Sequence, residues 1–392
     1  MKKVLTVVCA ALLAGAAAMV TPAFAEDPKP AGLNPDDLKK ALGLSIYLQG
    51  GYTANASASS ETGVAGGPGS ENNLRVFDHK ANSFTLDLAQ IVFARDPAAS
   101  AIGYKVKLSA GETAKWIHAR GLSGAPLTSP QSGEGTDSID ITEAYVSYTA
   151  PVGKGLRFDL GKMVTYFGAE VIEAIDNPNY SRSLLFDYAI PFTHTGLKMS
   201  YAFTDAVNAS FHVVNGWDNA TDNNTGKCVG VNINLTPSEK VSGSVNFMEG
   251  PEKDDNTREN RSLLDLVATI KPIKPLSIIL NYDDGKEEHV LPSGGDAKWS
   301  GFAGIVKYDF NDTYSLSVRG ELFDDKDGFR LPTSTPGVSQ KVTEFTVTPE
   351  IRTASGIILR PEYRHDSSDK QTFDNGTKKS QDTIALGVMY RW

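Results

Sequence analysis

Charged side chains occupy every second position in many short stretches of this sequence, with apolar side chains between them. In residues 314–322, Arg319 and Glu321 alternate with Val318 and Leu322. Neighbouring side chains of an extended strand point to opposite faces, so each stretch has a charged face and an apolar face. The basic members of the charged face are Lys105, Lys107, Arg157, Lys198, Lys307, Arg319, Arg360, Arg364 and Arg391, and the acidic members are Glu143, Asp159, Asp265, Asp309, Glu321, Glu344, Glu350 and Glu362. Facing rows of both signs can orient passing polar solutes by their electric field.

A second group of charges lies in one long segment, residues 168–195, and comprises Glu170, Glu173, Asp176, Asp187 and Arg182. This segment is also partly apolar, since it contains Val171, Ile172, Ile175, Leu184, Leu185, Phe186 and Ile190. A long loop with its own apolar surface should fold against something. We expect it to fold inward, where its acids would face basic residues such as Arg319 and Arg360 across a constriction, with Arg182 on either side. The alternative is an external loop that packs on its neighbours or on an adjacent subunit.

Other candidate chemistry is sparse. The common hydrolase, metalloprotease and phosphate-binding motifs do not occur, and the histidines are scattered. Ser210 and His212 share one strand face, but we expect no contact between them in a triad geometry. Asp218 and residues 222–224 could offer oxygen ligands to Ca²⁺, although their spacing is not that of an EF-hand. The sequence therefore predicts no enzyme, no metal site and no cofactor.

The elements that must position these charges are β-strands. About sixteen alternating stretches lie between Leu44 and Trp392, and the segments that join them are alternately long, roughly 10 to 30 residues, and short, about 3 to 6 residues. This rhythm predicts an all-β fold, a transmembrane antiparallel β-barrel of about 16 strands with short periplasmic turns and long extracellular loops. The stretches 84–94 and 156–167 alternate poorly near Gln90 and Gly161, because of a bulge or a misplaced boundary. A strand number of 14 or 18 therefore stays open.

The charged face must point inward, because a basic side chain on the lipid face costs about 2 to 4 kcal/mol near the midplane. A barrel of 16 to 18 strands leaves an aqueous lumen, so we expect these charges to stay hydrated around a water-filled passage. The alternative is a salt-bridged, plugged interior. Aromatic residues close many apolar rows, which is typical of girdles at the membrane interfaces, as at Tyr52, Phe203, Tyr282, Phe310, Tyr363 and Trp392.

The ends and the composition agree with export to a membrane. Residues 1–25 read as a secretory signal peptide, with Lys2 and Lys3 before an apolar run and Ala23 and Ala25 at the cleavage site. Residues 26–43 are expected to be a periplasmic lead-in with a short helix, and residues 44–392 the barrel. No later run reaches the roughly 20 apolar residues of a membrane-spanning helix. The net charge of −9 argues against a nucleic-acid partner.

Several motifs carry a resemblance to a known family. They are the Gly161-Lys162 pair, TYFGAE at 165–170, NYSRS at 179–183, PFTHTG at 191–196 and VNGWD at 214–218. In these the sequence resembles the OmpL-like β-barrel porin family over residues 40–392, which implies a bacterial outer-membrane porin. The architecture is also similar to that of general 16-stranded porins, whose third long loop bends into the lumen and which are trimers. The terminal Trp392 departs from the Phe usual in such barrels, but an aromatic end still suits recognition by the barrel-assembly machinery.

The sequence thus predicts a channel in the outer membrane of a Gram-negative bacterium, surrounded by membrane lipid and lipopolysaccharide. The resemblance to general porins implies a homotrimer. The expected function is passive diffusion of small hydrophilic solutes and ions. One alternative is a substrate-specific channel, whose track of residues could begin with Tyr47, Tyr145 and Phe186. The other is a plugged barrel that serves as an anchor or adhesin.

Overall fold

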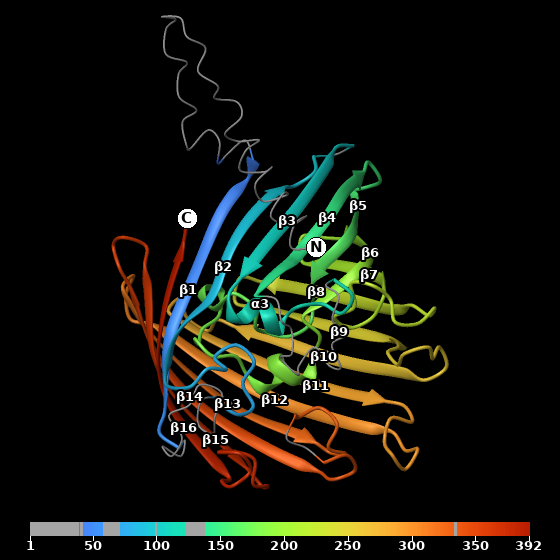
Figure 1. Ribbon diagram of the computed structural model, residues 1–392. Coiled ribbons are helices and arrows are strands. Elements are labelled where there is room, and N and C mark those ends of the chain that lie inside the picture. Colours follow the sequence, from blue (N-terminus) through green and yellow to red (C-terminus); the bar gives the residue numbers. More distant parts are fainter. Residues whose placement is uncertain (1–38, 40–41, 58–70, 99, 123–137, 333–334) are drawn as a thin grey trace, which may run out of the picture. The chain divides into compact units, whose positions relative to one another are not determined.

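Residues 42–392 form a closed antiparallel barrel of sixteen strands, counted over the part of the chain that the computed structural model describes. That part comprises residues 39, 42–57, 71–98, 100–122, 138–332 and 335–392. The predicted signal peptide and most of the predicted lead-in lie outside the described residues. Each strand pairs with its neighbours in sequence, and β1 closes the barrel by pairing with β16 (Figure 1). The all-β barrel and the strand number of 16 are confirmed.

The strands alternate in direction around the barrel. Their bounds are β1 Leu44–Asn55, β2 Ser83–Arg95, β3 Ile102–Ala110, β4 Ile139–Ala150, β5 Leu156–Val164, β6 Thr193–Ala202, β7 Val207–Val214, β8 Cys228–Ser238, β9 Val241–Pro251, β10 Asn260–Ile270, β11 Leu276–Glu287, β12 Ala297–Asp309, β13 Tyr314–Asp325, β14 Gln340–Arg352, β15 Ile358–Ser368 and β16 Ser380–Arg391. Among the described residues of the connections, three short helical segments occur, namely α3 Glu112–Trp116, the 3₁₀ turn η2 Ala174–Asp176 and the π-helix η3 Leu185–Ala189. No helix in the described residues is long and apolar enough to span a membrane.

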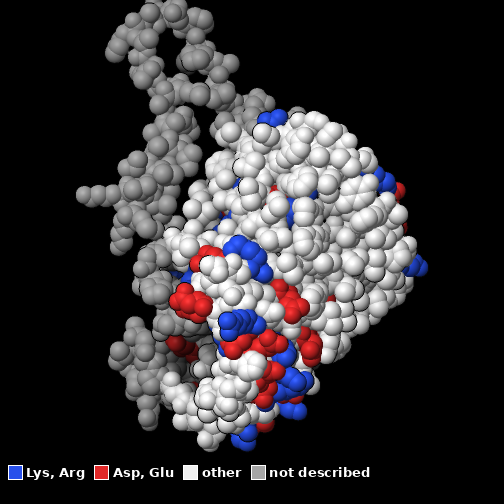
Figure 2. Space-filling model, turned by 90° about the vertical axis from the view of Figure 1, so that its right-hand side faces the viewer, with Lys and Arg blue, Asp and Glu red and all other residues white. Residues whose placement is uncertain are grey.

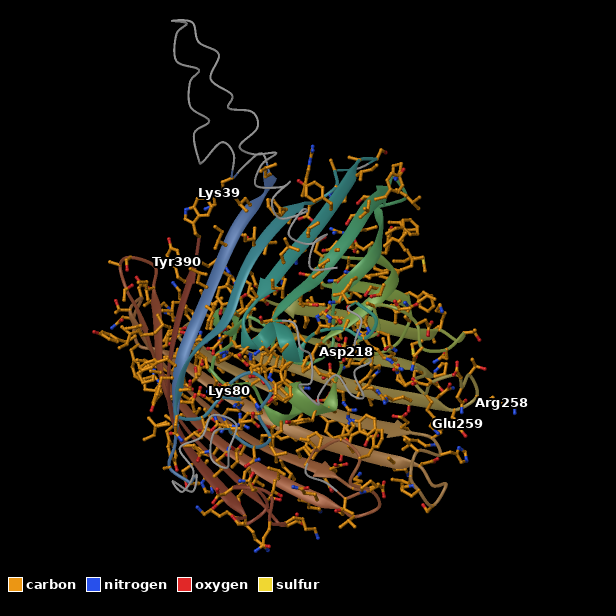
Figure 3. The ribbon with its side chains drawn as sticks, viewed as in Figure 1. Lys39, Lys80, Asp218, Arg258, Glu259 and Tyr390 are labelled. Atoms are coloured by element: carbon orange, nitrogen blue, oxygen red, sulfur yellow. The ribbon has the colours of Figure 1, made fainter. Side chains whose placement is uncertain are left out.

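Long and short connections alternate as predicted. The chain makes tight turns such as 151–155, 203–206 and 239–240 at one end of the barrel, which we call the short-turn end. The long connections, including 165–192 between β5 and β6, leave from the opposite end. The connections 252–259 and 288–296 are somewhat shorter than the range expected from the sequence. Arg258 and Glu259 of the first of these lie at the outer end of its hairpin in Figure 3.

The two faces of the strands differ as the alternation predicts. On β13 the apolar Val318 and Leu322 are partly or largely exposed, whereas Arg319 and Glu321 between them are buried. The last strand repeats this pattern, with Ile384 exposed and Met389 buried. Figure 2 shows the result from one side: a broad surface almost free of charge, with most Lys, Arg, Asp and Glu gathered in the lower part of the view and a few at its edges. The apolar face is the lipid face and the charged face lines the barrel interior.

The two weak stretches have different explanations. On β2 the pairing with β1 skips one residue between Gln49 and Gly50, which makes Asp87 an extra residue in the strand, a β-bulge close to Gln90. By contrast, β5 pairs regularly with both neighbours and ends at Val164. The pairing therefore shows no bulge at Gly161, and the predicted boundary at residue 167 was three residues too late.

Candidate functional site

The connection between β5 and β6, residues 165–192, lies inside the barrel, and we call it the inward loop. Its backbone is bonded to inner-face residues of strands that are far from β5 in the barrel. Near its start, Gly168 N donates to Asp265 of β10 at 3.1 Å, and Ala169 N donates to Asn281 of β11 at 2.9 Å. Near its end, the Trp299 indole of β12 donates to the carbonyl oxygen of Ala189 at 3.1 Å. Most of its residues are buried.

Three of the acids predicted in this loop bind basic residues of the wall directly. Glu170 contacts Arg319 at 2.9 Å, Glu173 contacts Lys107 at 2.8 Å, and Asp176 forms two hydrogen bonds with Arg391, one of them at 2.8 Å. The sequence reasoning placed Glu170 and Arg319 on opposite sides of a constriction, which is wrong because the two groups are an ion pair. Of these three acids, only Asp176 is exposed.

The expectation of hydrated basic residues is also wrong for part of the wall. Arg319, Arg360 and Arg364 are at most 1% exposed because the inward loop covers them. Arg360 donates to Glu350 at 2.7 Å and to the carbonyl oxygen of Asn179 in the loop at 3.0 Å. A guanidinium group can be buried only when its donors are matched by acceptors in good geometry. These arginines therefore anchor the loop and do not line a passage.

Two glutamates on the inner face hold the loop backbone from the same side of the barrel. Glu362 of β15 accepts hydrogen bonds from Tyr180 N at 2.7 Å and Ser181 N at 3.0 Å. Glu321 of β13 accepts from Leu184 N at 2.7 Å and Leu185 N at 2.6 Å. Charge-assisted bonds from neutral amides to a carboxylate are stronger than neutral ones, so the pair fixes both the position and the direction of residues 180–185.

The other two predicted loop residues contact the loop itself and the β1–β2 connection. Arg182 donates to the carbonyl oxygens of Val171, Ile172 and Tyr180, and its guanidinium group lies 4.6 Å from the centre of the Phe77 ring. It is a cross-link inside the loop and faces no solute. Asp187 accepts a hydrogen bond from Val76 N at 3.2 Å, and burial raises its pKa to about 7.

Tyr180 is an anchor that the sequence reasoning missed. Its ring lies over Gly51 of β1 and Gly387 of β16, two glycines that face each other across the strand pair. A Cβ atom on Gly387 would lie 2.3 Å from the Tyr180 ring, so only glycine leaves room. The phenol donates to Asp87 at 2.6 Å, the extra residue of the β2 bulge. We call Gly51 and Gly387 the glycine slot.

Aromatic residues join the inward loop to other connections at the long-loop end. Phe77 of the β1–β2 connection packs against Phe186 and Phe192, with ring centres 5.5 and 5.6 Å apart. Trp217, of the VNGWD motif, lies edge-on to Trp299 at 6.1 Å. The neighbouring Asp218 accepts from Phe192 N and Thr193 N, and burial raises its pKa to about 6. In Figure 3 Asp218 lies within the barrel outline, as its burial requires.

The remaining predicted wall charges lie on the inner face as ion pairs. Lys105 contacts Glu143 at 2.7 Å, Lys198 contacts Asp159 at 3.4 Å, and Lys307 contacts Glu350 at 3.5 Å. Other pairs on this face are Arg157 with Asp159, Arg352 with Asp309, Arg319 with Glu344 and Arg364 with Glu344. Unlike the buried arginines, most of the bases near the short-turn end keep part of their side chain in water.

The residues considered for catalysis give a mixed outcome. Ser210 Oγ lies 2.8 Å from His212 Nε2, so the two side chains are hydrogen-bonded on one strand face. His212 also stacks on Tyr166, with ring centres 4.0 Å apart, and is buried. Within the described ranges, no group of three or more His, Cys, Asp and Glu side chains is arranged to hold a metal ion.

A closed sixteen-stranded barrel with an apolar outer face, a charged inner face and a long loop inside it defines an outer-membrane β-barrel of the porin class. The chain belongs to the family described as "Putative beta-barrel porin-2, OmpL-like", whose model matches residues 41–392. It is therefore an outer-membrane porin, a channel for passive diffusion. A comparison with curated protein sequences gives no significant match.

Solved structures with the same fold are distant in sequence. The outer-membrane channel DcaP of Acinetobacter baumannii is 12% identical, with a TM-score of 0.57 over 89% of this chain and 96% of that one. An anion-selective porin from Comamonas acidovorans is 9% identical, with a TM-score of 0.57 over 89% and 98%. The trimer form of OmpT, an outer-membrane protein of Vibrio cholerae, is 11% identical, with a TM-score of 0.55 over 89% and 98%. At these identities the likeness establishes the fold alone.

Proposed function

We propose that small hydrophilic solutes and ions cross this porin through the space between the inward loop and the uncovered part of the wall, with the loop as the constriction. The observation that supports this is the fixed path of residues 165–192 inside the barrel. Hydrogen bonds tie the loop to β10 and β11 near its start and to β13 and β15 near its middle. A loop held in this way narrows the lumen, whereas a sixteen-stranded barrel without it would have a wide pore.

The test is single-channel recording from the purified protein in a planar bilayer. Steady ohmic openings support the proposal. Replacing Tyr180 by Ala should enlarge the conductance, because this removes the side chain that seats the loop in the glycine slot. Persistent silence from a correctly folded barrel would reject diffusion and favour the plugged anchor or adhesin, and an unchanged conductance in the Tyr180 variant would take the loop out of the conducting path.

At the loop, Asp176 and Arg391 are the predicted charges that a passing ion can reach, since both side chains are about half exposed. We propose that this pair lines the constriction, whereas Glu170 and Glu173 only hold the loop. Asp176→Asn should therefore leave the loop in place, free Arg391 and shift the reversal potential toward anions. A larger shift in a Glu170→Gln or Glu173→Gln variant would contradict this division.

We also propose that the protein is not an enzyme. Ser210 and His212 are the nearest approach to a nucleophile and a base, but both are buried and the imidazole is stacked on Tyr166. Incubation with chromogenic acyl esters should give no hydrolysis above that of a Ser210→Ala variant. Turnover that the variant abolishes would overturn the proposal.

The remaining partners are proposals that rest on the family and the fold. We propose export by a signal peptide at residues 1–25, assembly through the last strand that ends at Trp392, and a membrane environment of lipid and lipopolysaccharide. The trimer form recorded for OmpT of Vibrio cholerae supports a homotrimer. Light scattering in mild detergent would give the oligomeric mass, and a monomer would reject the trimer.

A further inference from the structure

Six basic side chains of the inner face lie near the short-turn end of the barrel, and we call them the basic ring. They come from β3, β5, β6, β12, β14 and β16 and are Lys105, Arg157, Lys198, Lys307, Arg352 and Arg391. All lie within five residues of the end of their strand at the short-turn end of the barrel. They are separate from the buried arginines that anchor the inward loop.

Three of the acids that pair with the ring are buried behind it, against the wall. The side chains of Lys105, Lys198 and Lys307 are 21–35% exposed, whereas those of their partners Glu143, Asp159 and Glu350 are 1–3% exposed. Each pair is therefore a dipole with its positive end toward the water. In water of high dielectric constant, an ion in the lumen interacts mainly with the charges closest to it.

The buried acids are also shared between several bases. Asp159 contacts Arg157 as well as Lys198, and Glu143 contacts Lys107 as well as Lys105. Glu350 contacts Lys307, Arg352 and Arg360. Three carboxylates therefore serve seven cationic groups, of which Lys107 also contacts Glu173 of the inward loop.

Further acids reduce this excess without removing it. Exposed Asp309 contacts Arg352 at 2.8 Å, and exposed Asp176 contacts Arg391. Exposed Asp96, in the β2–β3 turn, contacts Arg157 at 3.0 Å. These three acids form ion pairs mainly with Arg352, Arg391 and Arg157, although Asp309 also lies 4.0 Å from Lys307. The lysines are therefore the ring members whose charge acts most directly on the lumen.

We propose that the basic ring makes this porin anion-selective, so that its substrates are small hydrophilic anions such as carboxylates and phosphates. The inference rests on the proposed function, since a ring acts only on ions that pass it. The positive dipole ends raise the local concentration of anions and lower that of cations. A unit charge about 6 Å away in water changes an ion's local concentration by about threefold.

The experiment compares wild-type protein with a triple variant, Lys105→Gln, Lys198→Gln and Lys307→Gln, in planar bilayers with a potassium chloride gradient near 0.1 M. The reversal potential of the wild-type channel should have the sign of the chloride equilibrium potential. The chloride-over-potassium permeability ratio of the triple variant should be at least about threefold lower than that of wild type. At 1 M salt, where the Debye length is about 3 Å, the difference should largely vanish.

A matched control is available at the same end of the barrel. Lys154, Lys240 and Lys274 lie in the exposed short turns, outside the lumen. Replacing these three by Gln gives the same change in net charge and should leave the permeability ratio unchanged. An equal effect in this control would mean that net surface charge, and not the ring, sets the selectivity.

The outcomes separate the two proposals. A wild-type preference for potassium, or a triple variant that matches wild type while conducting normally, would overturn the anion selectivity and leave the diffusion channel intact. Absence of conductance in wild type would overturn the proposed function itself. If the triple variant fails to fold, each lysine replaced singly gives the same comparison, with a smaller expected shift.

Discussion

Single side chains decide how the inward loop is held. Arg319 shows this best, because it contacts Glu344 on the neighbouring strand, Glu170 in the loop and the carbonyl oxygens of Ser181 and Arg182. The residue joins the wall to both halves of the loop. Removing one partner of a buried ion pair leaves the others charged and unpaired, which is more damaging than the loss of the pair itself.

We therefore expect Arg319→Ala to destabilise the barrel by about 3–5 kcal/mol. The measurement is the urea midpoint of the folded, heat-modifiable form in detergent. Lys105→Ala, which removes a partly exposed member of an ion pair on the same face, is the control and should cost about 1 kcal/mol or less. Equal losses in the two variants would show that burial at Arg319 does not matter.

Asp187 gives a pH-dependent prediction. Burial raises its pKa to about 7, well above the usual value for aspartate. The packed loop therefore binds the proton more tightly than the unpacked loop does, and the stability from packing falls as pH rises from about 4 to about 7. Asp187→Asn should remove this contribution, so its stability relative to wild type should increase by an amount of order 1–4 kcal/mol between pH 5 and pH 8. Thermal midpoints at several pH values test this, and parallel curves for the two proteins would contradict it.

At the scale of elements, the strands were predictable and the seat of the loop was not. Period-two alternation identified both faces, since lipid and lumen impose opposite polarity on neighbouring side chains. The apolar content of residues 168–195 also indicated an inward loop. Which charge meets which depends on barrel geometry: Glu170 and Arg319 are 149 residues apart in the chain. The one available signal was glycine on the inner face, at Gly51 and Gly387, which marks a close approach.

The glycine slot is testable with a matched pair of variants. Gly387→Ala places a methyl group 2.3 Å from the Tyr180 ring, whereas a Cβ at Gly320 has no other atom within 4 Å. We expect Gly387→Ala to unseat the loop and to give a larger, noisier conductance, and Gly320→Ala to behave as wild type. Adding Tyr180→Ala to Gly387→Ala should change the conductance little further, because the loop has already lost its seat in the single variant. A quiet Gly387→Ala channel would mean that the slot does not position the loop.

For the whole molecule, the positions of the charged residues on the inner face were predicted, but which of them are buried and which are exposed to water was not. Alternation along a strand shows only which face a side chain lies on. It cannot distinguish a base under the loop, such as Arg364, from one beside the lumen, such as Lys198. The distinction arises from the loop, which covers one part of the wall and leaves the rest to water. Because the loop covers this part of the wall, the loop and the barrel pack as one unit.

This unity predicts slow hydrogen exchange in the inward loop. The amides of residues 180–185 include four that are bonded to Glu321 and Glu362 in a buried site. Their exchange, followed by mass spectrometry in detergent, should be as slow as that of the strands and much slower than that of residues 252–259. Fast exchange at 180–185 would show that the loop opens independently of the barrel.

The glycine slot also has a consequence for the order of assembly. Gly51 belongs to the first strand and Gly387 to the last, and the two come together only where β1 pairs with β16. Until that seam closes, Tyr180 has no binding site, so the loop cannot adopt its final position in a partly built barrel. Docking of Tyr180 is therefore a late event in biogenesis. It can occur only after the first and last strands have paired in the correct alignment.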